Sequence, residues 1–223
     1  MTSTSIEPAK PSFFRRGLVA FVRWFDTSAN VETGEADPDA IDWLRVIPFI
    51  AMHLACLAVI WVGFSWFALW IALSLYAIRM FAITGFYHRY FSHKAFRTSR
   101  PMQFLFALVG AASVQRGPLW WAAHHRHHHR HADTEQDMHS PRHGFFRSHM
   151  GWFLTKRGFA TNLANIPDLA KFPELRYLDR FDIVVPILLA IGLYVLGNIL
   201  EAMAPQLHTN GLQLLIWGFF IST

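Results

Sequence analysis

The chain has 223 residues, of which 53% are hydrophobic and only 16% are charged, against about 25% charged in an ordinary soluble domain. This composition excludes a typical soluble domain and indicates a chain that is partly embedded in lipid. The net charge of +5 does not indicate a nucleic-acid partner, because the basic residues lie between apolar segments, where anionic lipid headgroups account for them. The single cysteine, Cys56, excludes an internal disulfide and a Cys-x-x-Cys metal site.

Residues 1–40 are predicted to form an N-terminal segment outside the membrane. Residues 13–25 are amphipathic at the helical period, with an apolar face opposite Arg16 and Arg23, which is typical of a helix at the membrane interface. The alternative is an ordinary surface helix packed on protein. Its apolar face contains Phe14, Leu18, Phe21, Val22 and Phe25. Residues 26–40 are predicted to be a linker.

A run of 42 residues, 46–87, contains a single charged residue, Arg79. As one helix it would be about 63 Å long, twice the thickness of a bilayer core of about 30 Å. The run therefore predicts two spans. We place the turn between Trp61 and Trp66, where Gly63 can end the first helix. Pro48 is expected in the first turn of that helix.

A third span is predicted over residues 183–200, with Pro186 in its first turn. A fourth apolar run starts at Leu212 and is still apolar at Thr223, so we expect a fragment whose fourth span is cut short. Residues 101–114 are apolar but too few to cross a bilayer, and are expected to pack on other helices or beneath the membrane surface.

The basic residues predict the orientation. Of the 20 lysines and arginines, 14 lie in residues 88–180 and five in residues 1–45. Cytoplasmic segments carry such an excess, so both regions are predicted to face the cytoplasm. The predicted fold is all-α: a multi-pass transmembrane helical bundle with a cytosolic helical cap.

Thirteen histidines are present, and eight of them fall within residues 88–93 and 124–131. His88 and His93 are five apart, which is a rotation of about 140° on a regular helix. Such a pair can serve two neighbouring metal ions, or one ion if the helix ends between them.

The second stretch, His124 to His131, contains the pattern His-x-x-His-His twice. Imidazoles with this spacing share one helical face, and they suit iron, zinc, copper or nickel. A histidine-rich solvated loop that sequesters metal is the alternative. Spacing alone does not choose between the two registers, which are His124, His127, His128 and His125, His128, His129.

The stretches "TGFYHRYFSHKAFRTS" and "WWAAHHRHHHRHADTEQDMHSPRHGFFRSHMGWFL" resemble the integral-membrane fatty acid desaturases, in particular the Δ9 acyl-CoA branch. The motifs that carry the resemblance are His-Arg-x-x-Ser-His at 88–93, His-Arg-x-His-His at 125–129, and the Gly-Phe-x-x-Ser-His-x-Gly-Trp pattern at 144–152. The resemblance covers about residues 42–221 and is most specific over 84–154.

The resemblance implies two irons held mostly by histidines, with O2 as co-substrate and an electron donor such as ferredoxin or cytochrome b5 with its reductase. In that family an arginine follows the first histidine of the second motif, which selects His125. The implied ligands are His88, His93, His125, His128 and His129. His149 is expected to support the site, and Trp120 and Trp121 to line an acyl tunnel, with helix packing as the alternative for the tryptophans.

Three departures from the family pattern affect the interpretation. A third histidine motif is absent, so residues 41–223 are expected to be an incomplete desaturase domain that is inactive alone and binds iron weakly. Ala123 and His124 replace the Arg-Asp pair of animal members near the CoA group, which leaves both acyl-CoA and acyl lipid as substrates. The extra histidines suggest a bacterial-type member, in an inner membrane rather than the endoplasmic reticulum.

The leading hypothesis is thus an oxygen-dependent diiron desaturase that introduces a cis double bond, at Δ9, into a fatty acyl chain. A hydroxylase or monooxygenase with the same histidines is the nearest alternative. A histidine-rich membrane metal-binding protein is disfavoured, because the predicted spans contain only His53 and Arg79 as ionisable groups that could form a metal path.

Overall fold

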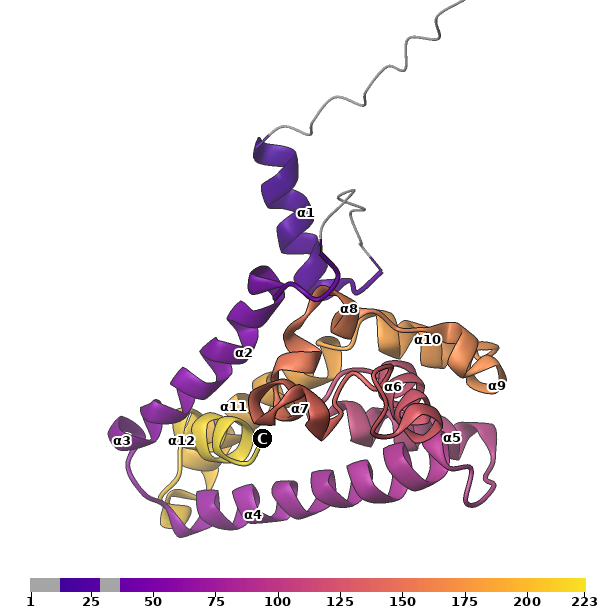
Figure 1. Ribbon diagram of the computed structural model, residues 1–223. Helices are drawn as coiled ribbons and strands as arrows, with labels where there is room; N and C mark the ends of the chain where they lie inside the picture. Colours follow the sequence, from indigo (N-terminus) through magenta and orange to yellow (C-terminus); the bar gives the residue numbers. More distant parts are fainter. Residues whose placement is uncertain (1–12, 29–36) are drawn as a thin grey trace, which may run out of the picture.

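The computed structural model describes residues 13–28 and 37–223 (Figure 1). Over these residues the chain is helical apart from turns and one isolated bridge between Ile41 and Thr155. The predicted all-α class is therefore confirmed. The predicted interfacial segment forms helix α1 (Phe13–Phe25). Residues 1–12 of the predicted N-terminal segment and 29–36 of the predicted linker lie outside the described residues.

Within the described residues, three helices are long and apolar enough to cross a membrane. The first, Trp43–Val62, consists of α2 (Trp43–Ala55), η1 (Cys56–Ala58) and α3 (Val59–Val62). The second, Trp66–Ser92, consists of α4 (Trp66–Phe81) and the π-helical segment η2 (Ala82–Ser92). The third is α11 (Val184–Met203). The remaining apolar run forms a shorter helix, Gly211–Ile221, made of α12 (Gly211–Leu215) and η7 (Ile216–Ile221).

The turn between the first two spans lies where the sequence predicted it. α3 ends at Val62, and Gly63 has a φ of +73°, a left-handed conformation that glycine adopts without strain. α4 then begins after Ser65, whose hydroxyl accepts a hydrogen bond from the backbone N–H of Ala68. Trp61 and Trp66, on either side of the turn, are 77% and 69% exposed, as expected of residues at a membrane interface.

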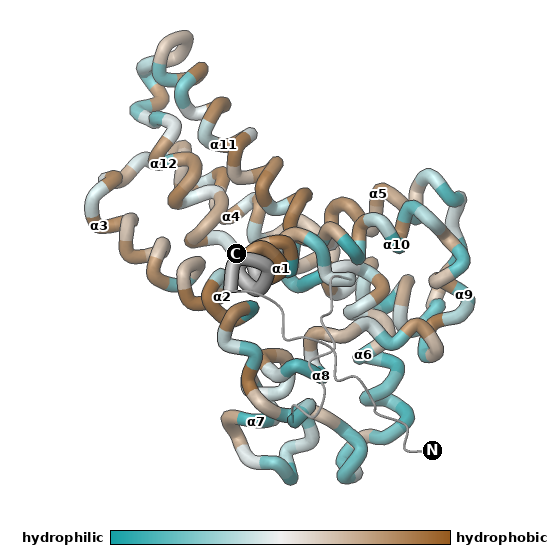
Figure 2. Tube along the Cα trace, turned by 90° about the horizontal axis from the view of Figure 1, so that it is seen from above, coloured by the Kyte–Doolittle hydropathy of each residue, from teal (hydrophilic) through white to brown (hydrophobic). Residues whose placement is uncertain are grey.

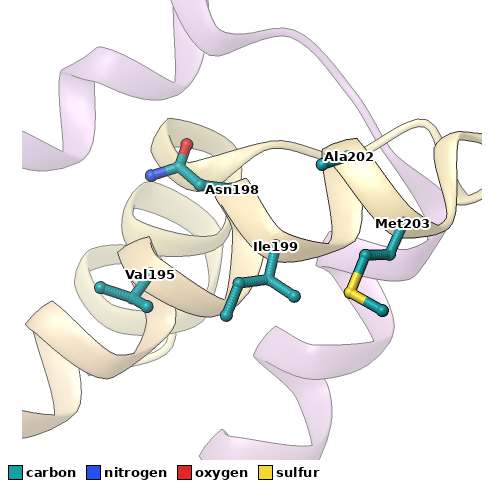
Figure 3. Close-up of a pocket in the computed structure, with 5 residues that line it drawn as sticks. All are labelled: Val195, Asn198, Ile199, Ala202 and Met203. Carbon is teal, nitrogen blue, oxygen red and sulfur yellow. The ribbon is translucent and has the colours of Figure 1, made fainter.

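Few side chains of the spanning helices are covered by protein. Between 11% and 22% of each span's most apolar window is buried, so most of its apolar surface is left open for lipid or further protein to cover. Hydrophobic residues are concentrated on α2, α4, α11 and α12, whereas the region of α6 and α7 is hydrophilic (Figure 2). A shallow hollow on α11 belongs to the apolar surface (Figure 3). It is lined by Val195, Asn198, Ile199, Ala202 and Met203, none of which is ionisable.

Helix α2 begins earlier than expected, and Pro48 therefore lies inside it rather than in its first turn. The helix starts at Trp43 because the Asp42 side chain accepts a hydrogen bond from the backbone N–H of Arg45. Proline has no N–H to donate to the carbonyl four residues before it, that of Leu44. The indole Nε1 of Trp24 donates to that carbonyl instead, at 2.9 Å. The carbonyl that Pro48 leaves without a backbone hydrogen bond thus anchors α1 to α2.

The segment between the second and third spans forms a cap of short helices. Its bounds are α5 (Arg100–Ala111), α6 (Pro118–His131), η3 (Pro141–His143), α7 (Phe145–His149), η4 (Gly151–Leu154), α8 (Lys156–Phe159), η5 (Leu163–Asn165), α9 (Pro167–Ala170) and α10 (Pro173–Arg180). The apolar run 101–114 became α5, which packs on η2: the hydroxyl of Tyr87 donates to the Ala107 carbonyl at 3.3 Å. The buried core joins η2, α5, α6 and α10 through residues that include Tyr87, Phe91, Leu119 and Leu175.

Candidate metal centre

His88 and His93 meet because the second span ends as a π-helix. The backbone N–H of His93 donates to the carbonyl of His88 at 3.0 Å, a bond between residues five apart. This wider turn brings the two rings together edge to face, with their Nε2 atoms 3.0 Å apart. From the sequence we expected the pair to serve two neighbouring ions, or one ion if the helix ended between the two residues. The π-helix ends at Ser92 and His93 is its C-cap, so the helix does end between them, after a widened turn that a regular helix lacks.

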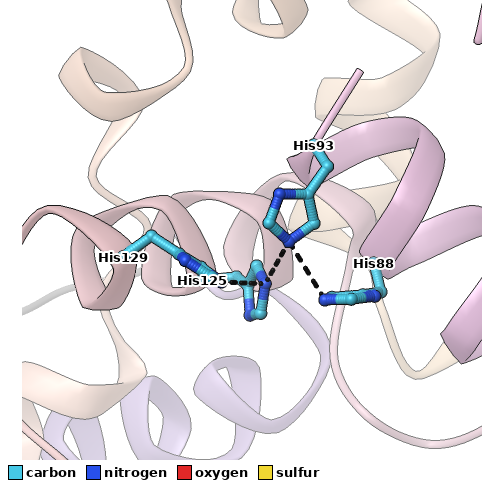
Figure 4. A group of neighbouring side chains, drawn as sticks. All are labelled: His88, His93, His125 and His129. Carbon is cyan, nitrogen blue, oxygen red and sulfur yellow. Dashed lines mark hydrogen bonds between the residues drawn. The ribbon is translucent and has the colours of Figure 1, made fainter. Parts of the chain in front are cut away.

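Helix α6 presents a second pair. His125 and His129 are four apart and lie on one face of a regular helix, with their Nε2 atoms 3.0 Å apart. The Nε2 of His125 is also 3.0 Å from that of His93, so the two pairs form one group (Figure 4). One ring nitrogen from each of the four residues lies within 4.8 Å of all the others.

His128 points to a different group. Its Nδ1 is 3.0 Å from Oδ2 of Asp137, and its ring stacks on that of His139 at 4.0 Å between centroids. Its ring centroid is 5.6 Å from His129 and 6.5 Å from His125, so it borders the four-histidine group. Its role as a metal ligand stays a prediction. Sequence reasoning missed Asp137 and His139, although both lie in the acidic stretch that follows the second motif.

In the other possible register, which begins at His124, the side chains of His124 and His127 contact backbone carbonyls. The Nε2 of His124 is 3.1 Å from the Ala160 carbonyl, and the ring packs beside Trp120 and Trp152. Burial lowers the pKa of His124 to about 4, which keeps this ring neutral. The Nε2 of His127 lies 2.9 Å from the Gln136 carbonyl.

The four-histidine group is electrostatically suited to a cation. Burial, followed by the charges of the neighbouring rings of His129, His88 and His93, lowers the pKa of His125 to about 3. Burial, followed by the charges of His88 and His129, also lowers the pKa of His93. Both rings are therefore neutral at physiological pH, as metal ligands must be.

The donor set fits a first-row transition metal. Two imidazole nitrogens about 2.1 Å from one ion and at right angles to each other are about 3 Å apart. That is the 3.0 Å separation of the neighbouring Nε2 atoms. Nitrogen ligands without carboxylates favour iron, zinc, copper or nickel over magnesium or calcium, which prefer oxygen. His88 and His125 are half-buried, whereas His93 and His129 are exposed, so the group is open to solvent on one side.

Arg126 holds the two histidine-bearing helices together. It projects from α6, and its guanidinium donates to the carbonyl oxygens of Phe91 (2.6 Å) and Ser92 (3.1 Å) at the end of η2. It also forms a two-point ion pair with Asp168, at 2.6 and 3.1 Å. These bonds fix the last turn of the π-helix against α6. The arginine of the second motif thus has a structural role that its position beside His125 did not reveal.

The start of α6 is fixed by a residue distant in the sequence. Oδ1 of the buried Asp179 accepts a hydrogen bond from the backbone N–H of Trp120 at 2.6 Å. This bond replaces the side-chain cap that Gly117 lacks. A Cβ at Gly117 would lie 2.3 Å from Asp179 Oδ1, so only glycine permits this approach. Burial raises the pKa of Asp179 to about 6, although the hydrogen bonds from Trp120 and Thr161 oppose the shift.

The three remaining predicted site residues, Trp120, Trp121 and His149, differ in what they contact. Trp121 stacks on the ring of His125, with 4.8 Å between centroids and 24° between planes. Trp120 is 7% exposed, stacks on Trp152 and donates from Nε1 to the Gly158 carbonyl at 2.8 Å. His149 is exposed and stacks on Phe145. Acyl binding by the tryptophans and a supporting role for His149 remain predictions.

Helices long and apolar enough to cross a membrane, and a cap that gathers four histidines able to hold a metal ion at the end of the second of them, are the features of a membrane protein with a candidate metal site. The model of the family described as fatty acid desaturase matches residues 64–223. The chain therefore belongs to the fatty acid desaturase family, and the resemblance seen in the sequence is confirmed.

Similar proteins include several lipid desaturases. The palmitoyl-monogalactosyldiacylglycerol delta-7 desaturase of Arabidopsis thaliana is 35% identical, over 82% of this chain and 47% of the relative. The sn-1 stearoyl-lipid 9-desaturase of Anabaena variabilis is 32% identical, over 81% of this chain and 62% of the relative. The sn-2 palmitoyl-lipid 9-desaturase of Nostoc sp. (strain 36) is 36% identical, over 70% and 56%. The chain spans about half the length of the curated relatives it matches.

Proposed function

We propose that the protein to which this chain belongs is an oxygen-dependent desaturase that introduces a cis double bond into a fatty acyl chain. The observation that carries the proposal is the convergence of His88, His93, His125 and His129 at the end of a membrane span. A metal ion held there would be within reach of both a lipid chain and the aqueous phase. The relatives named as 9-desaturases favour the Δ9 position.

The metal in the proposal is a pair of irons, with His88, His93, His125, His128 and His129 as the ligands from this chain. The bound irons, with O2 as co-substrate, would supply the oxidising power that removes two hydrogens from an unactivated acyl chain. The chain's own residues hold the metal and its surroundings. Neutral imidazoles supply the nitrogen donors, Arg126 fixes the two histidine-bearing helices against each other, and Trp121 covers one face of His125.

The substrate in the proposal is an acyl-CoA or an acyl lipid, which reaches the centre from the bilayer. Trp121 is the better placed of the two tryptophans to contact an acyl chain, because its ring lies against a proposed ligand. Trp120 is hydrogen-bonded into the cap. Residues 41–223 would form the desaturase domain, and residues 1–40 a cytosolic segment with an interfacial helix, in which Leu18 and Phe21 are 55% and 56% exposed.

The proposed orientation places the N-terminus and the histidines in the cytoplasm of a bacterial cell, in its inner membrane. The basic residues of the cap support this orientation. Electrons would come from a separate donor such as ferredoxin or cytochrome b5 with its reductase. The exposed side of His93 and His129 is the open face of the centre toward such a donor.

Lipid analysis tests the proposal. The complete gene that encodes this chain is expressed in bacteria that lack a desaturase, and the fatty acids are separated as methyl esters by gas chromatography and mass spectrometry. We expect a new cis-monounsaturated acid with wild type and with the control His131→Ala, and none with His125→Ala. A hydroxylated acid in place of the unsaturated one would identify a hydroxylase and overturn the proposal.

A further inference from the structure

The carboxylate of Asp137 is buried beside the four-histidine group. Asp137 lies in the loop after α6, it is fully buried, and both of its carboxylate oxygens accept hydrogen bonds from the backbone. Oδ1 accepts from the N–H of His139 and Oδ2 from the N–H of Asp133, each at 3.2 Å. Oδ2 also faces Nδ1 of His128 at 3.0 Å. A buried carboxylate that accepts this many hydrogen bonds is a specific part of the loop structure.

The hydrogen bonds of Asp137 determine which nitrogen of His128 carries the proton. An ionised carboxylate can only accept hydrogen bonds, so the proton between Oδ2 and Nδ1 has to come from the ring. The neutral ring of His128 then has N–H at Nδ1, and the lone pair at Nε2 is free for a metal. The opposite tautomer would place two lone pairs against each other at 3.0 Å.

The ring is also held in orientation by aromatic contacts. His139 stacks on His128 with 4.0 Å between centroids and 27° between planes. Trp152 supports His139 from the other direction, at 5.2 Å and 36°. One carboxylate therefore fixes the proton of His128, and a stacked pair of rings limits its rotation.

We propose that Asp137 is a positioning residue for His128: it holds the imidazole as the Nδ1–H tautomer and leaves Nε2 as a metal ligand. A carboxylate that accepts from the second nitrogen of a ligand histidine orients the ring and raises its basicity. The metal-binding part rests on the proposed function, whereas the tautomer does not.

The tautomer can be measured without metal. The chain is labelled with 15N-histidine, purified in detergent micelles and studied by NMR at pH 8, above the ordinary pKa of histidine of about 6.5. The signals of His128 are assigned by their loss in His128→Ala. We expect a protonated Nδ1 and an unprotonated Nε2, and in Asp137→Asn a shift toward Nε2–H, because the amide presents N–H toward the ring. Protonation at Nε2 in the wild-type chain would overturn the proposal.

The effect on metal affinity is measured by titration with Co2+, followed through its visible absorption. Asp137→Asn and Asp137→Ala are expected to weaken binding of the ion that His128 holds by about 10–100-fold. His131→Ala changes a histidine outside the group, so this control should bind within a few-fold of wild type. The stoichiometry at saturating Co2+ should not change.

The outcomes separate the two proposals. Wild-type affinity in an Asp137→Asn chain of unchanged helix content would overturn the positioning role. A lower number of bound ions, at unchanged affinity, would also overturn it, because it would make Asp137 itself a ligand. A wild-type chain that binds no Co2+ would count against the proposed function and leave the tautomer measurement to decide the role of Asp137.

Discussion

The spanning helices and the cap achieve their structures in different ways. At most 22% of a span's most apolar window is buried in protein, and side chains such as Ile60 and Trp70 are 71% and 64% exposed. Where the cap packs on the end of the second span, by contrast, Leu119 and Leu175 of the cap are at most 1% exposed and lie in one core with Tyr87 and Phe91 of the span. Arg126 of the cap also donates hydrogen bonds to backbone carbonyls at that end. Apolar length is enough where lipid is the solvent. The cap depends on particular contacts. Substitutions should therefore change the free energy of unfolding more in the cap than in the spans.

Matched glycines should give the largest contrast. A Cβ at Gly110, in α5, would lie 2.0 Å from the ring of Tyr87, whereas a Cβ at Gly192, in α11, would meet nothing within 4 Å. We expect Gly110→Ala to lower the free energy of unfolding by about 3 kcal/mol or more through overpacking. Gly192→Ala should be neutral, or stabilising by up to about 1 kcal/mol through reduced chain entropy. Denaturant titration in detergent, followed by circular dichroism, measures both. Equal effects would contradict the distinction between the regions.

The next largest effect concerns pH and Asp179. Its pKa is about 6 in the folded chain, against an ordinary value of 3.8, so the folded state holds the proton more tightly. The stability this gives is complete below pH 3.8 and is lost as the pH rises through about 6. The difference of about two units corresponds to up to about 3 kcal/mol. Wild type should therefore lose more stability between pH 4 and 7 than Asp179→Asn, which keeps the acceptor for Trp120. Parallel pH profiles would contradict the assignment.

Arg126→Lys should have a smaller effect. Lysine keeps the charge, but it cannot reach Asp168 and the carbonyls of Phe91 and Ser92 together. We expect a loss of about 2 kcal/mol in the free energy of unfolding, together with weaker Co2+ binding, because the two histidine pairs are no longer fixed against each other. Arg130→Lys, at an exposed position on the same helix, is the control and should change stability by less than about 0.5 kcal/mol.

The smallest effect is expected at the anchor of α1. Trp24→Phe removes the donor to the Leu44 carbonyl and should cost about 1 kcal/mol. Pro48→Ala supplies a backbone N–H for the same carbonyl. In the Pro48→Ala background, the Trp24→Phe change should therefore cost less. A double-mutant cycle of unfolding free energies measures this coupling. Additive effects would show that the indole bond does not compensate for the proline.

The sequence was sufficient for the spans, because they depend on local quantities. An apolar run of known length, a glycine and two tryptophans placed the turn at Gly63 correctly. The starts of helices were less accurate: the contact between Asp42 and the N–H of Arg45 moved the start of α2 ahead of Pro48.

The metal centre was only partly predictable. The spacing of His125 and His129 follows from a regular helix, and the structure brings them together with His88 and His93. The meeting of His88 with His93 depends on a change of backbone hydrogen bonding, which residue spacing does not reveal. The pairing of His128 with Asp137 depends on a loop that folds back over nine residues. Tertiary contacts therefore decided what the histidine pattern left open.

Because the second span ends as a π-helix, the pair His88 and His93 has the same 3.0 Å separation of Nε2 atoms as the pair His125 and His129. A widened turn brings residues five apart into the relation that an ordinary α-turn gives to residues four apart. Removing one residue between His88 and His93 would let a standard helix present the same two rings. The extra residue can therefore be understood as an insertion tolerated where the helix leaves the bilayer, and it explains how two motifs of unequal length can supply equivalent halves of one centre.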